Sequence, residues 1–215
     1  MCKDVIKKIE EEKLIVIVRG VERQKLVPLA EAMYRGGIRL LEVTFDATGK
    51  CSDSETAENI RLLCDEFKGK MSIGAGTVLT KKQVELVKKA GGSFIISPNT
   101  DKRVIKATKK LGMVSMPGAL TPSEVKKAVD FGADFVKLFP VSNFGPDYVK
   151  AVKAPLSNIK FTAVGGIDEN NMVDYIKVGV SGFGIGTNIV NKKMIEENNY
   201  DAITELATRY VNALR

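Results

Sequence analysis

The chain has 215 residues, 44% of them hydrophobic and 27% charged, which is enough apolar side chain to bury the core of one compact domain. Histidine is absent, which excludes His-based catalytic triads, imidazole acid–base catalysis and most zinc or iron sites. The formal net charge of +7 comes from basic residues scattered over expected helix faces without an aromatic-interleaved basic patch, so we expect no nucleic-acid partner, although small anionic ligands are favoured.

The first predicted element is an additional N-terminal helix over residues 3–12. The opening, MCKDVIKKIEEEK, is too charged for a signal peptide, and no apolar run in the chain reaches the about eighteen residues that a membrane span needs. The three cysteines (Cys2, Cys51 and Cys64) cannot all pair with one another and show no metal-ligand spacing, which suits a reducing compartment. We therefore expect a cytoplasmic protein with no metal and no membrane partner.

Eight short β-rich runs follow in chain order, separated by segments with helical periodicity. The runs are LIVIVR (14–19), IRLLEVT (38–44), MSIGAGT (71–77), SFIISP (93–98), MVSMP (113–117), DFVKLFP (134–140), IKFTAV (159–164) and SGFGIGT (181–187). This alternation predicts an α/β fold in which residues 1–215 form one (β/α)8 barrel of the TIM type. A doubly wound open sheet is the structural alternative, which the missing G-x-G-x-x-G after the first run disfavours.

The ends of the intervening helices are also marked in the sequence. Glycines precede several strands, in YRGGI, KAGGS, KLGMV, DFGAD and KVGVS, where a left-handed residue would end each helix. Thr121, Pro122 and Glu124 offer an N-cap, a first helical residue and a capping-box partner. Asp168 is predicted to cap the helix after the seventh strand.

Barrel enzymes place their sites at the C-terminal ends of the strands. The polar or special residues expected there are Arg19, Glu42, Thr44, Thr77, Ser97, Pro98 and Lys137. These positions are therefore the candidates for the functional site.

Lys137 stands alone inside an apolar strand, in ADFVKLFP. Strand alternation places it on the same face as Ala133, Phe135 and Phe139, and if that face lines the barrel, the amine lies between aromatic rings. Desolvation would favour the neutral amine, a nucleophile that can attack a ketone and form an iminium ion. The alternative is a lysine that reaches solvent from the strand end or pairs with an acid.

Glu42 is the second charge expected inside the barrel, because it shares a strand face with Ile38, Leu40 and Thr44. Burial would raise the pKa of its carboxyl group and suit it to shuttle protons during carbon–carbon cleavage. A structural ion pair between Glu42 and Lys137 is the alternative, and it predicts the same proximity.

Glycine-rich segments follow the last two strands, VGGID (164–168) and GFGIGTN (182–188). Barrels commonly bind phosphate there, with backbone N–H groups and a helix N-terminus, because glycine lets a ligand approach the backbone closely. We favour a phosphate site over ordinary turns.

Taken together, these segments resemble the 2-keto-3-deoxy-6-phosphogluconate (KDPG) and 4-hydroxy-2-oxoglutarate (KHG) aldolases, which are class I lyases on this barrel. The resemblance spans nearly the whole chain and rests on LLEVT (40–44), GAGTVLT (74–80), ISP (96–98), PGALTPSE (117–124), VKLFPV (136–141), GGI (165–167) and IGTN (185–188). It implies that Lys137 forms a Schiff base with pyruvate, that Glu42 is the general acid/base, and that the enzyme is a homotrimer without metal or other cofactor.

The resemblance also assigns substrate contacts. Arg19 and Thr77 would lie at the pyruvyl carboxylate, and Phe139 and Pro98 would shape the pocket. The phosphate would lie at Gly165, Gly166, Gly186 and Thr187.

Two positions depart from the family pattern. The motif EVT-x-R-T reads EVTFDA here, so Asp46 replaces an arginine that helps to hold the substrate carboxylate, and the loop that follows is longer by roughly half a dozen residues. An acid there would repel a carboxylate unless Arg19 or Lys50 compensates. The family's PTGGI reads AVGGI (163–167), which removes a hydroxyl near the phosphate loop.

The expected function is a cofactor-free class I aldolase that cleaves a 2-keto-3-deoxy sugar-acid phosphate, or 4-hydroxy-2-oxoglutarate, into pyruvate and an aldehyde. One rival is a metal-dependent sugar-phosphate epimerase or decarboxylase with Glu42 and Asp46 as ligands. The other is a non-catalytic phosphosugar-binding barrel in which Asp46 marks lost turnover.

Overall fold

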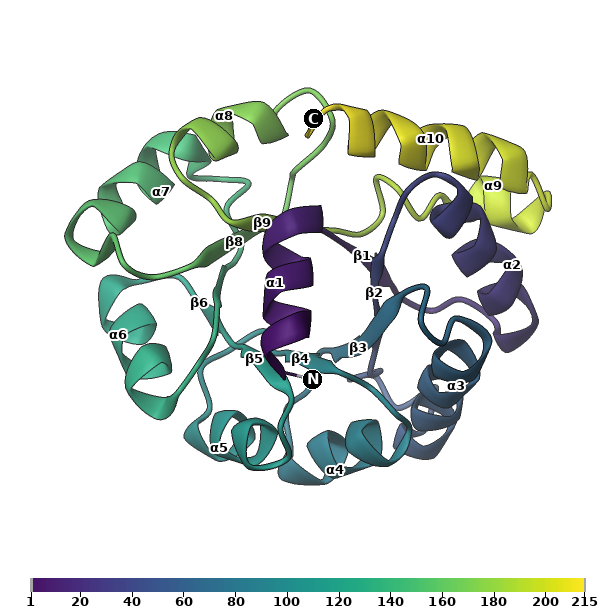
Figure 1. The fold of residues 1–215 in the computed structure, drawn as a ribbon, viewed down its shortest axis with the longest axis horizontal. Helices are drawn as coiled ribbons and strands as arrows, with labels where there is room; N and C mark the ends of the chain where they lie inside the picture. The colour runs from purple at the N-terminus through teal and green to yellow at the C-terminus, as the bar shows by residue number, and fades with distance from the viewer. Residues whose placement is uncertain (1, 215) are drawn as a thin grey trace.

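The computed structural model describes residues 2–214 as a nearly closed barrel of parallel strands surrounded by helices (Figure 1). The strands are β1 (Leu14–Val18), β2 (Leu40–Thr44), β3 (Ser72–Gly76), β4 (Phe94–Ile96), β5 (Val114–Met116), β6 (Gly118–Ala119), β7 (Val136–Leu138), β8 (Phe161–Val164) and β9 (Gly182–Ile185). The helices are α1 (Cys2–Glu12), α2 (Arg23–Arg35), α3 (Asp53–Glu66), α4 (Lys81–Lys89), α5 (Lys102–Lys110), α6 (Pro122–Phe131), α7 (Gly145–Lys153), the 3-10 turn η1 (Ala154–Leu156), α8 (Met172–Lys177), α9 (Lys192–Glu196) and α10 (Tyr200–Asn212). The predicted barrel and the predicted N-terminal helix are both confirmed.

The fifth predicted strand is divided into two short strands, β5 and β6, which pair with different neighbours and so connect the two edges of the sheet. Pro117 has no N–H to donate, and it separates β5, which pairs with β4, from β6, which pairs with β7. The carbonyl of Pro117 accepts a hydrogen bond from the backbone N–H of Lys137. The strand order β5-β4-β3-β2-β1-β9-β8-β7-β6 therefore begins and ends on one segment of chain.

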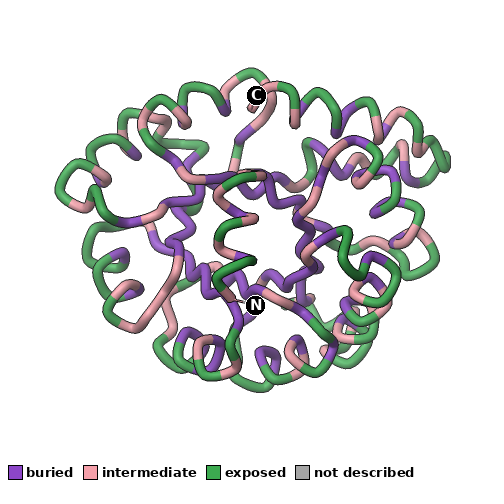
Figure 2. Tube along the Cα trace, in the orientation of Figure 1, coloured by how far each residue is buried: buried purple, intermediate pink, exposed green. Residues whose placement is uncertain are grey.

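Alternate side chains of each strand pack into two separate cores. Leu41, Val43, Val136 and Leu138 belong to the large cluster between the strands and the surrounding helices. A second cluster fills the barrel interior, with Ile15, Leu40, Phe94, Ile96, Val114, Met116 and Phe135. Figure 2 shows the buried strands as a continuous central ring inside more exposed helices.

Helix α1 lies across the end of the barrel from which the strands start (Figure 1). Val5 and Ile9 of this helix join the interior cluster, and Ile9 is completely buried. Helix α1 therefore covers the N-terminal ends of the strands and leaves their C-terminal ends for a site.

Most predicted helix ends are confirmed. The glycines that follow helices have positive φ angles, at Gly37, Gly91, Gly112, Gly132 and Gly179. Thr121 and Glu124 form the predicted capping box at the start of α6.

The prediction for Asp168 is wrong, since α8 begins only at Met172. The Asp168 carboxylate instead accepts hydrogen bonds from the backbone N–H groups of Asn170 and Asn171, in a turn before the helix. Among residues 2–214, no helix is both long enough and apolar enough to cross a bilayer.

Candidate active site

A cavity of about 430 Å³ opens at the C-terminal ends of the strands, at the opposite end of the barrel from α1. Ten of the predicted site residues line it: Arg19, Glu42, Thr77, Pro98, Lys137, Phe139, Gly165, Gly166, Gly186 and Thr187. These residues come from seven strands or the loops after them, so the barrel brings together side chains that are far apart in the sequence.

Lys137 projects from the middle of β7 into the barrel, as strand alternation predicts, because its neighbours Val136 and Leu138 pack on the helix side. The side chain is buried, and Nζ lies 4.6 Å from the centroid of the Phe139 ring at the cavity mouth. Burial lowers the pKa of the amine, with Glu42 opposing the shift and Arg19 adding to it. This environment favours the neutral, nucleophilic form.

Glu42 lies on β2 and is also buried, at 2% exposure. Burial raises the pKa of its carboxyl group to about 7, despite the opposing effects of Lys137 and Arg19. A Cβ atom on Gly76 of β3 would lie 1.9 Å from Oε1 of Glu42, so glycine at this position makes room for the carboxyl group. Ile38 precedes β2 and packs on the helix side, so the predicted face begins at Leu40.

The alternative of a structural ion pair between Glu42 and Lys137 is wrong. Within residues 2–214 the two side chains form no hydrogen bond or ion pair with each other, and Oε2 of Glu42 is buried without a partner. The carboxyl group and the amine therefore face one cavity and remain available to a ligand.

Arg19 and Thr77 extend the cavity toward its mouth. Arg19 directly follows β1, is exposed, and forms no ion pair within the described part of the chain. Thr77 directly follows β3 with φ of 55°, a left-handed conformation that is uncommon for a residue other than glycine and that concentrates at functional sites. A free guanidinium group here can pair with a carboxylate in a bidentate manner.

The loops after β8 and β9 form another part of the cavity wall. Gly165 and Gly166 have φ angles of 101° and 68°, and a Cβ atom on Gly166 would lie 2.6 Å from Cβ of Ser142. Nδ2 of Asn188 donates to the Ile167 carbonyl at 2.9 Å and links the two loops. The backbone N–H groups of Gly165, Gly166, Gly186 and Thr187 donate no hydrogen bond to another residue of the 2–214 range, which leaves them free for an anion.

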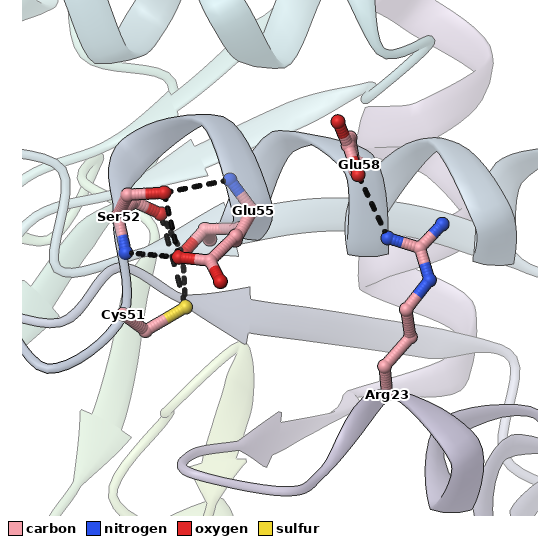
Figure 3. Close-up of polar contacts among 6 residues, drawn as sticks. Arg23, Cys51, Ser52, Glu55 and Glu58 are labelled. Atoms are coloured by element: carbon pink, nitrogen blue, oxygen red, sulfur yellow. Dashed lines mark hydrogen bonds and ion pairs between the residues drawn. The ribbon is translucent and has the colours of Figure 1, made fainter.

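A second, larger cavity of about 890 Å³ adjoins the first and shares Arg19, Thr77, Pro98 and Phe139 with it. Figure 3 shows part of its wall, where Arg23 of α2 pairs with Glu58 of α3 at 2.9 Å. In the same view Ser52 and Glu55 exchange the hydrogen bonds of a capping box at the start of α3. These wall carboxylates are engaged with neighbouring groups of the chain.

Asp46, which replaces the family arginine, is bound within its own loop. Its carboxylate accepts hydrogen bonds from the backbone and hydroxyl of Thr48, at 2.8 and 2.7 Å, and from the backbone of Cys51 at 3.0 Å. These bonds lower the pKa of Asp46 to about 2. Asp46 and Glu42 line different cavities, and residues 2–214 contain no cluster of three or more His, Cys, Asp or Glu side chains suited to a metal ion.

The sequence analysis missed two polar residues of the cavity that contains Lys137 and Glu42, and it placed two others there incorrectly. Asn188 and Lys192 line it; Asn188 ends the predicted glycine loop GFGIGTN (182–188), and Lys192 follows that loop shortly after. Ser97 instead donates from Oγ to the Val78 carbonyl, and Thr44 lines only the larger cavity.

Comparison with known proteins agrees with this geometry. The family model described as KDPG and KHG aldolase matches residues 5–206. A 2-dehydro-3-deoxy-6-phosphogalactonate aldolase of Escherichia coli (strain K12) is 34% identical over 82% of this chain and 83% of its own.

Two solved structures are also similar. The native KDPGal structure has a TM-score of 0.84 and 32% identity, over 94% of each chain. A KDPG aldolase from Legionella pneumophila, with pyruvate captured as a covalent carbinolamine intermediate, has a TM-score of 0.82 and 32% identity over 92% of this chain and 93% of its own. Because the family match extends over nearly the whole barrel and the same cavity holds the buried lysine and glutamate, this chain belongs to the KDPG and KHG aldolase family.

Proposed function

We propose that this chain is a class I aldolase that cleaves a 2-keto-3-deoxy sugar-acid phosphate, or 4-hydroxy-2-oxoglutarate, into pyruvate and an aldehyde. The observation that carries the proposal is the buried, unpaired amine of Lys137 facing the same cavity as Glu42, whose pKa is about 7. The family's aldolases, one of them captured with covalently bound pyruvate, support the reaction class.

The reaction begins when the neutral amine of Lys137 attacks the C2 carbonyl of the substrate. The resulting carbinolamine loses water to give a protonated imine, which acts as an electron sink. Glu42 takes the proton from the C4 hydroxyl as the C3–C4 bond breaks, so that the aldehyde leaves and an enamine remains on Lys137. Protonation of the enamine at C3 and hydrolysis of the imine then release pyruvate and restore the amine.

Glu42 is suited to both directions of proton transfer. A pKa of about 7 keeps both the acid and its conjugate base populated near neutral pH, which is the best match for a group that alternately donates and accepts. Its buried Oε2, without a partner within residues 2–214, leaves hydrogen-bonding capacity for the substrate or a carbinolamine hydroxyl.

The remaining cavity residues hold the two ends of the substrate. Arg19 and Thr77 bind the carboxylate next to C2, and Arg19 takes over the role that the arginine at the position of Asp46 has in the family. Phe139 and Pro98 shape the pocket, and Gly165, Gly166, Gly186 and Thr187 bind the distal phosphate through backbone N–H groups. Since the Asp46 carboxylate accepts hydrogen bonds from Thr48 and Cys51, it is engaged within its own loop, which weakens the interpretation of Asp46 as a mark of lost turnover.

Reduction with borohydride in the presence of pyruvate tests the proposal. We expect one reduced pyruvyl group on the peptide that contains Lys137, detected by mass spectrometry, and we expect Lys137→Met to abolish both trapping and pyruvate release. Lys153→Met is the matched control, because Nζ of Lys153 also lies near an aromatic ring, 5.6 Å from the Phe161 centroid, but outside the cavity.

An unmodified Lys137 would contradict the proposed lysine chemistry. Binding of sugar phosphates without pyruvate release, in an assay coupled to lactate dehydrogenase, would instead support the non-catalytic barrel.

We further propose that the chain acts as a homotrimer in the cytoplasm. Membership in a family that typically forms homotrimers supports the assembly, and the free state of Cys2, Cys51 and Cys64 supports a reducing compartment. Sedimentation equilibrium should give three times the chain mass of 23.4 kDa.

A further inference from the structure

Four charged side chains line the cavity that contains Lys137. Arg19, Glu42 and Lys137 lie on or directly after β1, β2 and β7, whereas Lys192 lies in the chain that follows the glycine loop after β9. Lys192 is exposed, and it forms no hydrogen bond or ion pair within the described range 2–214. Its neighbour Lys193 differs, because its Nζ lies 4.0 Å from Glu197 and it does not line the cavity.

The groups around Lys192 would bind an anion but carry no full positive charge. The free backbone N–H groups of residues 165, 166, 186 and 187 are neutral donors, and Val164 contributes only apolar surface to the cavity. A phosphate monoester carries close to two negative charges at neutral pH, because its second pKa is about 6. Neutral donors can position such a group, whereas an ammonium ion nearby balances its charge with charge-assisted hydrogen bonds.

We propose that Lys192 is the specificity-determining residue for phosphate at the distal end of the substrate. This inference rests on the proposed aldolase function and adds a cation from the chain after β9 to the glycine loops. As a consequence, this chain selects phosphorylated substrates through Lys192. Val164 lines the same cavity and has no side-chain hydroxyl to offer the phosphate.

The test compares two substrates that differ only in the phosphate, a 2-keto-3-deoxy sugar acid with and without its phosphoryl group. For Lys192→Met we expect the ratio of kcat/KM values, phosphorylated over unphosphorylated, to fall roughly tenfold or more, mainly through a higher KM. Lys192→Arg should recover most of the preference, because it restores the charge. Lys193→Met, which removes a neighbouring exposed ammonium group outside the cavity, should leave the ratio at the wild-type value.

A binding measurement makes the test independent of catalysis. Calorimetric titration with glycerol 3-phosphate should show weaker binding to Lys192→Met than to the wild type. Glycerol, which lacks the phosphate, should show no measurable binding to either protein. The difference should shrink as salt is raised, because the contact is electrostatic.

The outcomes separate this inference from the proposed function. If wild-type protein traps pyruvate on Lys137 but Lys192→Met keeps the wild-type preference, Lys192 is only a solvated surface lysine and the inference is wrong. An equal loss for both substrates would also overturn it, because a phosphate contact must act selectively. If Lys137 is not trapped, the aldolase proposal fails, and the glycerol 3-phosphate titration still decides whether Lys192 binds phosphate.

Discussion

Glu42 has the environment of a residue that is retained for chemistry at a cost in stability. It is buried without an ion pair among the described residues, and burial raises the pKa of its carboxyl group from 4.5 to about 7. Between these values the folded chain binds more protons at this site than the unfolded chain does. The stability of the fold therefore decreases as the pH rises through about 7.

Glu42→Gln should therefore be more stable than the wild type at pH 8, by up to about 3 kcal/mol, while the two should differ little at pH 4. Urea unfolding at both pH values measures the difference, and pyruvate release should slow by roughly two to four orders of magnitude. A stability difference that is the same at both pH values would show that the effect comes from packing rather than from the charge.

The secondary-structure elements at the two ends of the barrel have different roles: one end stabilises the fold and the other carries the candidate active site. Helix α1 closes the end where the strands begin, and Ile9 from that helix is fully buried in the interior cluster. The cavity lies beyond the other end of the same strands, where loops carry Arg19, Thr77 and the glycines. Substitutions in α1 should therefore act on the free energy of unfolding and leave the site intact.

Ile9→Ala should lower the free energy of unfolding by about 2–4 kcal/mol, because it leaves a cavity in the interior core. At a temperature where the variant is still folded, kcat and KM for pyruvate release should match those of the wild type. Lys7→Ala, on the exposed face of the same helix, is the control and should change stability by less than about 0.5 kcal/mol. Loss of activity in the folded Ile9→Ala protein would contradict the separation of the two ends.

The whole molecule offers lysine chemistry rather than metal chemistry. The sequence contains no histidine, and residues 2–214 place Glu42 and Asp46 in separate cavities, with Asp46 bound by its own loop. The metal-dependent epimerase is the rival that this arrangement disfavours, because its predicted ligand pair does not form.

Dialysis against EDTA should leave the rate of pyruvate release unchanged, since the proposed electron sink is an imine on Lys137. Assays before dialysis, after dialysis and after addition of Mg²⁺ or Zn²⁺ provide the measurement. Activity that is lost on dialysis and restored by either ion would contradict the class I mechanism.

Much of the fold and the site could be predicted from local pattern. Strand alternation grouped Lys137 and Glu42 with apolar residues on one face of their strands because a strand has a period of two, and the glycines marked helix ends because left-handed backbone favours them. Asp168 was mispredicted because a capping residue and a turn residue look alike in sequence, and both accept hydrogen bonds from nearby N–H groups. The family resemblance then supplied roles that alternation alone could not.

The sequence by itself determined the alternation of strands and helices, and that one lysine and one glutamate share strand faces with apolar residues, because these follow from periodicities within short segments. Only the tertiary structure decided that Glu42 and Lys137 remain unpaired, that Asp46 is engaged by Thr48, and that Lys192 lines the cavity beside the glycine loops. The physical reason is that each of these depends on the distance between side chains in three dimensions, which barrel closure and loop packing set and which residue order does not encode locally.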